Sequence, residues 1–332
     1  MNVDTREQPA AVPPTVPIAG PSSAPHHAAR DPQRPAPQVR RIPRVVAALV
    51  AVLAAVGVGL TYRLFVTTTL GQHVDELARE GAVHGQDSLW RVAGPVLDVV
   101  SESFVVIGIS VAMAVALVRR RWVLALQVAV LVGGANLTTQ VLKRYVLDRP
   151  DLLDGWNGAN SLPSGHTTIA ASVSVALLLA TPRSWRSVVA LAGGAYTAAT
   201  GVSTLVGQWH RPSDVVAAVL VVLAWGALVC AFTPASSLDV APRRHRLPSG
   251  EPRPHAFASP GSSVVGCLLL LGAAVTGAIS AAATLRLARA DTLGVSPDIG
   301  AYATGALAVL AVTALAFGVL LLLRQATARP RD

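Results

Sequence analysis

The sequence predicts an all-α fold, a polytopic bundle of helices that cross a membrane, and three observations support this class. Only 14% of the 332 residues are charged and 52% are hydrophobic, whereas soluble domains contain about 25% charged residues. The mean hydropathy of the chain is positive. Apolar segments near the length of about 20 residues that a spanning helix needs recur along the chain. Together these properties exclude a soluble globular enzyme.

Residues 1–43 come first, and their composition differs from that of the remaining chain. They hold ten of the 23 prolines, with scattered arginines and no apolar period. Such a segment cannot bury enough apolar surface to offset the entropy lost on ordering. We therefore expect a disordered cytoplasmic tail. It separates the first apolar run from the N-terminus by too many residues for a cleaved signal peptide.

The apolar segments after the tail fall into two groups separated by a basic stretch. We expect six spans in residues 44–235, a basic cytoplasmic linker in residues 236–261, and two more spans in residues 262–332 that pack against the first six as a hairpin. The eight expected spans lie near 44–67, 95–118, 122–142, 166–181, 187–206, 214–233, 262–285 and 300–323. The fourth is the shortest.

Basic residues in the short loops indicate the orientation, because cytoplasmic loops carry an excess of Arg and Lys. If every span crosses once, five basic segments share one face. They contain Arg40, Arg41 and Arg44; residues 119–121; Arg183 and Arg186; Arg243, Arg244, Arg246 and Arg253; and Arg324, Arg329 and Arg331. We expect this face and both termini in the cytoplasm, as in a multi-pass protein of the cell membrane. The opposite loops 68–94 and 286–299 mix both signs of charge, whereas 143–165 and 207–213 carry chemical motifs.

The first motif segment to consider surrounds His210 and Asp214, one helical turn apart at the start of the sixth span. Between them, Pro212 suits the first turn of a helix. A carboxylate at this spacing can bond one imidazole nitrogen, fix the tautomer and leave the other nitrogen free to attack. The alternative is a histidine that caps the helix and an aspartate that interacts with the helix dipole.

A second motif segment, Pro163-Ser164-Gly165-His166, reads as a helix start. Ser164 is a plausible cap, and Gly165 lets backbone N–H groups approach an anion at the helix N-terminus. His166 can then protonate a departing oxygen. The alternative is an ordinary capped entry to a membrane span.

A third motif segment supplies fixed positive charge on the same face through Lys143 and Arg149. Arginine forks onto phosphate oxygens, whereas lysine acts as a point charge. The alternative is snorkelling at the membrane interface, but basic residues are otherwise sparse on this face and Lys143 is the only lysine in the chain. Two histidines, a carboxylate and these cations, without a set of metal ligands, fit metal-independent phosphoryl transfer through histidine.

This arrangement resembles the type 2 phosphatidic acid phosphatase (PAP2) superfamily of membrane lipid phosphatases. The family signature consists of Lys-x6-Arg-Pro, Pro-Ser-Gly-His and Ser-Arg-x5-His-x3-Asp, at the ends of spans in a six-helix core. The second part is complete here, and the third keeps Ser203, His210 and Asp214 at the family intervals. The resemblance covers about residues 44–235.

The resemblance implies a role for each matching residue. His210 is the expected nucleophile and forms a phosphohistidine, Asp214 orients it, and His166 is the acid for the leaving group. The residues expected to hold the phosphate are Lys143, Arg149, Ser164 and Gly165, with Ser203, Arg144 and Arg211 as further candidates.

Two departures from the family pattern affect the phosphate site. Five residues separate Lys143 from Arg149 instead of six, so that either the loop is tighter or Arg144 takes the part of the lysine. The family arginine after the serine is Thr204 here. Arg211, beside the nucleophile, is a candidate to compensate, and without compensation the phosphate is held more weakly.

The resulting expectation is an integral membrane hydrolase of phosphoric monoesters or pyrophosphates that acts on a phosphorylated lipid on the extracytoplasmic face. Its substrates would be of the kind of phosphatidic acid, phosphatidylglycerol phosphate or polyprenyl pyrophosphate, with no cofactor, no metal and no nucleic acid partner. Two alternatives stay open. One is a lipid-linked phosphotransferase that uses the same residues; the other is a weak or inactive family member, for which Thr204 is the motivation.

Overall fold

The structure is a computed structural model. It describes residues 39–86, 122–153, 159–240, 246–251, 253, 257–289 and 296–330, together with single positions at 91, 94, 110 and 114. All of them belong to the unit Pro37–Asp332. The predicted tail up to residue 38 and nearly all of the predicted second span, 95–118, lie outside the described residues.

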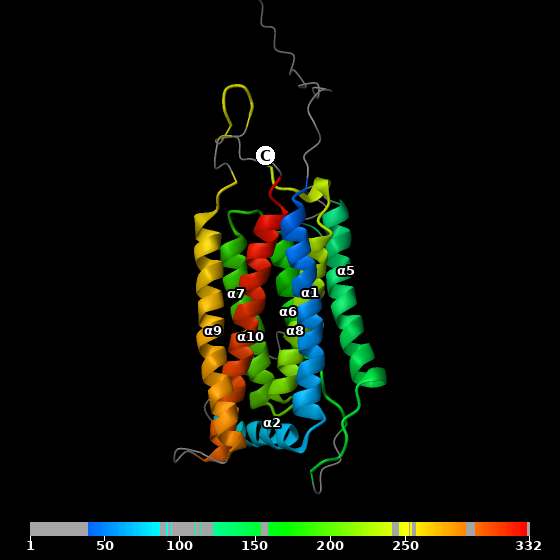
Figure 1. The fold of residues 1–332 in the computed structure, drawn as a ribbon, viewed down its shortest axis with the longest axis vertical. Helices are drawn as coiled ribbons and strands as arrows, with labels where there is room; N and C mark the ends of the chain where they lie inside the picture. The colour runs from blue at the N-terminus through cyan, green and yellow to red at the C-terminus, as the bar shows by residue number, and fades with distance from the viewer. Residues whose placement is uncertain are drawn as a thin grey trace, which may run out of the picture. The chain divides into compact units, whose positions relative to one another are not determined.

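The described residues form eight α-helices and no β-strand (Figure 1). The helices are α1 (Arg41–Thr61), α2 (Thr69–Gly81), α5 (Trp122–Val141), α6 (Gly165–Ala180), α7 (Arg186–Val206), α8 (Pro212–Ala231), α9 (Pro260–Ala288) and α10 (Pro297–Thr327). Single π-helical turns extend α1 and α5, as η1 (Tyr62–Val66) and η2 (Leu142–Val146), and a short 3₁₀ turn, η3 (Ala235–Ser237), follows α8.

Six of the described helical segments are long and apolar enough to cross a membrane. They are Arg41–Val66, Trp122–Val146, Arg186–Val206, Pro212–Ala231, Pro260–Ala288 and Pro297–Thr327. Helix α6 is apolar but has only 16 residues, as expected for the shortest predicted span. The prediction of an all-α, multi-pass membrane bundle is confirmed.

Apolar side chains lie both between the helices and on their outer faces. Helix α8 packs against α1, α5, α6 and α10, and its Val219 and Val222 are buried. On the outer faces of α1, α5 and α9, Leu53, Leu126 and Leu271 are all more than 60% exposed. Large apolar surfaces of this kind suit contact with lipid chains, because a bilayer interior is as apolar as the side chains themselves.

Helix α2 occupies the first part of residues 68–94, the segment of mixed charge that the sequence indicates as a loop between spans. It lies crosswise at one end of the upright helices (Figure 1) and contacts η1, α8, α9 and α10. Thr68 caps its start, since the Thr68 Oγ1 accepts a hydrogen bond of 3.0 Å from the Gly71 N–H. Its buried face combines the apolar Val74 and Ala78 with two carboxylates, Asp75 and Glu76.

The C-terminal hairpin consists of α9 and α10, and α10 lies against the rest of the bundle. It contacts α2, α7 and α8 as well as α9. Gly305 of α10 faces the ring of Pro212, and a Cβ atom at this position would overlap with that ring. A residue without a side chain therefore lets α10 approach the first turn of α8 closely.

Candidate active site

A cavity of about 740 Å³ lies where α5 and α7 end and where α6 and α8 begin. Its lining consists of Gln140, Lys143, Arg144, Leu147, Asp148, Arg149, Ala159, Asn160, Gly165, His166, Ile169 and His210. Six of these twelve residues carry chemistry in the three motif segments. The fold therefore brings segments that are far apart in sequence to one cavity.

His210 lies in the loop between α7 and α8 and is held from two sides. Its backbone N–H donates to the Thr204 carbonyl at 3.3 Å, and its Nδ1 lies 3.1 Å from the Asp214 Oδ2. An ionised carboxylate can only accept hydrogen bonds, so Nδ1 carries the proton of this bond. The Nε2 of a neutral His210 then has a lone pair available for attack.

Asp214, which is fully buried in the first turn of α8, is itself fixed by hydrogen bonds. Besides His210, its Oδ2 accepts from the Arg211 backbone N–H at 3.0 Å and from the Ser161 hydroxyl at 2.7 Å. Its backbone carbonyl accepts from the Ser164 N–H at 2.9 Å. These bonds connect the start of α8 to the loop before α6.

The two histidines face the same cavity from different helices. His166, in the first turn of α6, is exposed. The ring centroids of His166 and His210 are 6.3 Å apart, and the ring planes are inclined to each other by 66°. In-line transfer requires a nucleophile about 3 Å from phosphorus and a proton donor about 3 Å from the leaving oxygen. A separation of this size accommodates one phosphoryl group between the rings.

The N-terminus of α6 also faces the cavity. The buried Ser164 caps the helix, since its Oγ accepts from the Thr167 N–H at 3.4 Å. The next residue, Gly165, lines the cavity, and a Cβ atom there would contact only the amide of Gln140, at 3.9 Å. Free N–H groups and the helix dipole make such an end favourable for an anion.

Three basic side chains line the cavity from the end of α5 and the segment after it. Lys143 and Arg144 lie in the π-helical turn η2, and Arg149 follows in a segment without regular secondary structure. Asn160 holds this segment, because its Nδ2 donates to the carbonyl oxygens of Leu147 at 2.9 Å and of Lys143 at 3.5 Å. The shorter spacing between Lys143 and Arg149 thus still places both residues at the cavity.

Ser203, Thr204 and Arg211 do not belong to the cavity lining. Thr204 is fully buried, and its Oγ1 donates to the Gly201 carbonyl of its own helix at 2.7 Å. Ser203 is buried at the end of α7. The Arg211 guanidinium donates to the Glu76 Oε2 at 2.8 Å through Nε and to the Ser161 hydroxyl at 3.2 Å. Compensation for the missing arginine by Arg211 stays a prediction.

Sequence reasoning missed four residues that support the site: Asp75, Glu76, Asn160 and Ser161. Asn160 and Ser161 lie three and two residues before the second motif. The two carboxylates belong to α2, for which the sequence does contain a signal, because Leu70, Val74 and Ala78 recur every four residues after the capping Thr68.

The chemistry of the cavity is that of an anion site with two imidazoles. The lining contains three cationic side chains and one acidic side chain, Asp148. Nowhere in the part of the chain that the structure describes do three or more His, Cys, Asp or Glu side chains gather as a metal site. The arrangement can bind a phosphate group and present a nucleophile and a proton donor to it.

Comparison with known proteins gives one match. Residues 122–237 match the family model of the PAP2 superfamily. The match begins at α5, ends at η3 and includes all three motif segments, but not α1, α2 or the C-terminal hairpin. No curated protein and no solved structure matches the chain.

Proposed function

Residues 122–237 belong to the PAP2 superfamily, and from this membership we propose that the protein hydrolyses a lipid phosphate or a polyprenyl pyrophosphate through a phosphohistidine, without a metal ion. The protein has several helices that are long and apolar enough to cross a membrane, and its matched region belongs to a superfamily of phosphatases. One observation carries the proposal of phosphoryl transfer through a histidine. Two imidazoles with ring centroids 6.3 Å apart line a cationic cavity, and a buried carboxylate bonds one of them.

In the first half-reaction the Nε2 of His210 attacks phosphorus. A nitrogen–phosphorus bond forms, the bond from phosphorus to the lipid oxygen breaks, and His166 gives its proton to that oxygen. The lipid leaves as an alcohol, or as a monophosphate if the substrate is a pyrophosphate. Asp214 stabilises the positive charge that develops on His210, because its carboxylate bonds the opposite nitrogen.

In the second half-reaction water attacks the phosphohistidine. His166, now neutral, takes a proton from the water, the nitrogen–phosphorus bond breaks and inorganic phosphate leaves with His210 restored. Through both steps, Lys143, Arg144, Arg149 and the N–H groups at the start of α6 bind the phosphate oxygens.

The polarity of the bundle supports the expected orientation. Helices α6 and α8 both begin at the cavity, so their other ends lie on the far side of the bundle. There Arg44 donates to the Ala231 carbonyl at 2.8 Å, and Arg186 forms an ion pair of 2.8 Å with Asp239. Arginines at that end fit the cytoplasmic side, and we propose the extracytoplasmic side for the cavity.

The test is release of inorganic phosphate from a panel of lipid phosphates by the purified, detergent-solubilised chain in the presence of EDTA. We expect turnover of at least one lipid, none in His210→Ala, and a severe reduction in His166→Ala. His73→Ala, an exposed histidine on α2, is the matched control and stays active.

Three outcomes contradict parts of the proposal. Equal activity in the wild type and His210→Ala removes the nucleophile. Activity that disappears with EDTA and returns with Mg²⁺ contradicts a metal-free mechanism. Transfer of the phosphoryl group to a second lipid, without release of phosphate, identifies a phosphotransferase instead.

A further inference from the structure

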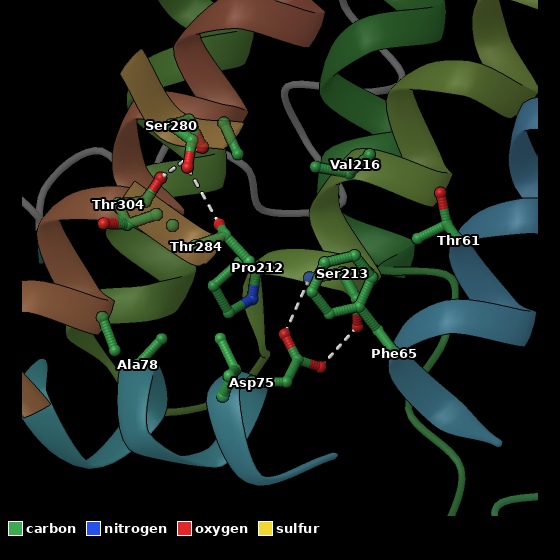
Figure 2. A pocket seen from close by; sticks show the side chains of 14 residues that line it. Thr61, Phe65, Asp75, Ala78, Pro212, Ser213, Val216, Ser280, Thr284 and Thr304 are labelled. Atoms are coloured by element: carbon green, nitrogen blue, oxygen red, sulfur yellow. Dashed lines mark hydrogen bonds between the residues drawn. The ribbon is translucent and has the colours of Figure 1, made fainter. Parts of the chain in front are cut away.

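Helix α2, which lies outside the family match, contacts the segment that carries the nucleophile at three points. The carbonyl of Arg79 accepts from the Gln208 side chain at 2.9 Å. Glu76 pairs with Arg211. Asp75 accepts from the backbone N–H of Ser213 at 3.1 Å and from its hydroxyl at 2.5 Å, at the edge of a small cavity of about 140 Å³ (Figure 2).

A continuous hydrogen-bonded path leads from Glu76 to the nucleophile. The Glu76 Oε2 accepts from the Nε of Arg211 at 2.8 Å, and the same guanidinium donates to the Ser161 hydroxyl at 3.2 Å. Ser161 donates to the Asp214 Oδ2 at 2.7 Å, which in turn bonds His210 at 3.1 Å. Glu76, Arg211, Asp214 and His210 are each less than 9% exposed, so water competes little for these bonds.

The charges along this path depend on Glu76. Its burial would raise its pKa, but hydrogen bonds from Arg79 and Arg211 and their charges hold the pKa below the usual value, so the carboxylate is ionised. Without that charge the buried Arg211 guanidinium loses its ion pair with Glu76, and its bond to Ser161 connects it to Asp214. A buried charge that loses its partner is strongly destabilising and draws other groups towards itself.

We propose that Glu76 is a positioning residue for the nucleophile: it holds the Arg211 guanidinium through Nε, so that Ser161 and Asp214 stay aligned on His210. Asp75 supports this by fixing the first turn of α8. The inference rests on the proposed phosphatase function, and it assigns to Arg211 a role in alignment in place of phosphate binding.

The first experiment measures kcat and KM for phosphate release by Glu76→Gln, which keeps the shape of the side chain and removes its charge. We expect kcat to fall roughly 10- to 100-fold, because small displacements of reacting groups have effects of this size, with KM within about twofold. Glu80→Gln, an exposed carboxylate of the same helix, is the matched control and keeps the wild-type values.

A double variant separates alignment from phosphate binding. In Glu76→Gln/Arg211→Gln both members of the ion pair are replaced, and two amides can bond each other and Ser161. We expect its kcat to exceed that of Glu76→Gln by about fivefold or more, since coupled charges are not additive. If Arg211 instead binds phosphate, Arg211→Gln raises KM about tenfold or more, the double variant keeps that high KM, and the proposal is overturned.

The last measurement does not depend on turnover and separates this proposal from the proposed function. Deuterium uptake of the peptide containing residues 207–213 should increase in Glu76→Gln but not in Glu80→Gln. Full activity of His210→Ala, or a wild type without turnover, removes the phosphatase mechanism, and alignment by Glu76 is then judged by uptake alone. Equal uptake in the two variants, or equal kcat, contradicts the role of Glu76.

Discussion

At the scale of single residues, the site depends on the three hydrogen bonds that one oxygen of Asp214 forms. Its Oδ2 accepts hydrogen bonds from the Ser161 hydroxyl and the Arg211 N–H and also bonds His210. Three hydrogen bonds to one oxygen restrict the orientation of the carboxylate, and the carboxylate in turn orients the imidazole of His210. The spacing of His210 and Asp214 along the sequence predicts their pairing, but nothing in the spacing predicts the two further partners.

Replacement of Asp214 by its isostere tests this constraint. Asp214→Asn should keep the fold but lower kcat about 10³-fold or more, because an amide stabilises neither the required tautomer nor the imidazolium. The measurement is phosphate release, with the unfolding temperature of the variant as the control for folding. Retention of more than about a tenth of the wild-type kcat would show that His210 needs no carboxylate.

The buried Asp75 predicts a pH dependence of stability. Burial and the nearby charge of Asp214 raise its pKa to about 7, against the hydrogen bonds from Ser213 and the charge of Arg149. The folded state therefore binds this proton more tightly than the unfolded state. The stabilisation is complete below about pH 4 and is lost as the pH rises through about 7.

Asp75→Asn should remove that dependence. Between about pH 5 and 8 the unfolding temperature of the wild type should fall relative to that of Asp75→Asn as the pH rises. The measurement is thermal unfolding in detergent at several pH values, with Glu80→Gln as the control, whose curve should follow the wild type. Parallel curves for the wild type and Asp75→Asn would contradict an elevated pKa.

At the scale of helices, the length of the apolar segments predicts the spans, whereas the short helix α2 is not predicted because charged residues interrupt its apolar pattern. Seven of the eight predicted spans coincide with described helices, because a spanning helix must contain about 20 apolar residues. Helix α2 is shorter, and its apolar positions alternate with charges whose partners, such as Arg211, lie more than 100 residues away. Sequence spacing cannot show that Glu76 is paired and buried, so the sequence indicates only a loop of mixed charge.

The contact between α10 and the first turn of α8 predicts an effect of Gly305→Val. A side chain at this position would collide with Pro212, and overpacking of this kind costs about 1–3 kcal/mol. We expect a lower unfolding temperature and, since Pro212 lies between His210 and Asp214, a lower kcat. Gly272→Val on α9, where a Cβ meets nothing within 4 Å, is the control and should have little effect; equal effects of both would contradict the contact.

At the scale of the whole molecule, the two ends of the bundle differ in charge and in chemistry. One end has the cavity with its histidines, and the other has arginines bonded to helix ends and to Asp239. The sequence predicts this polarity from loop charge alone, since the parity of the spans assigns the motif loops to one face. The side of the membrane on which each face lies is a proposal.

Labelling of single cysteines tests that orientation. In a background without Cys230 and Cys267, Glu80→Cys should react with a membrane-impermeant maleimide on intact cells, because α2 lies at the cavity end. Gly250→Cys, in the basic linker, should react only after the cells are permeabilised. The reverse pattern would place the cavity in the cytoplasm.

Detection of the covalent intermediate tests the central claim most directly. The wild-type chain, mixed with radiolabelled phosphatidic acid or a labelled polyprenyl pyrophosphate and quenched rapidly in base, should carry an acid-labile phosphoryl group on the peptide that contains His210. The same peptide from His210→Ala should carry none. A label on a serine, an aspartate or His166, or turnover of lipid without any label in the quenched protein, would contradict His210 as the nucleophile.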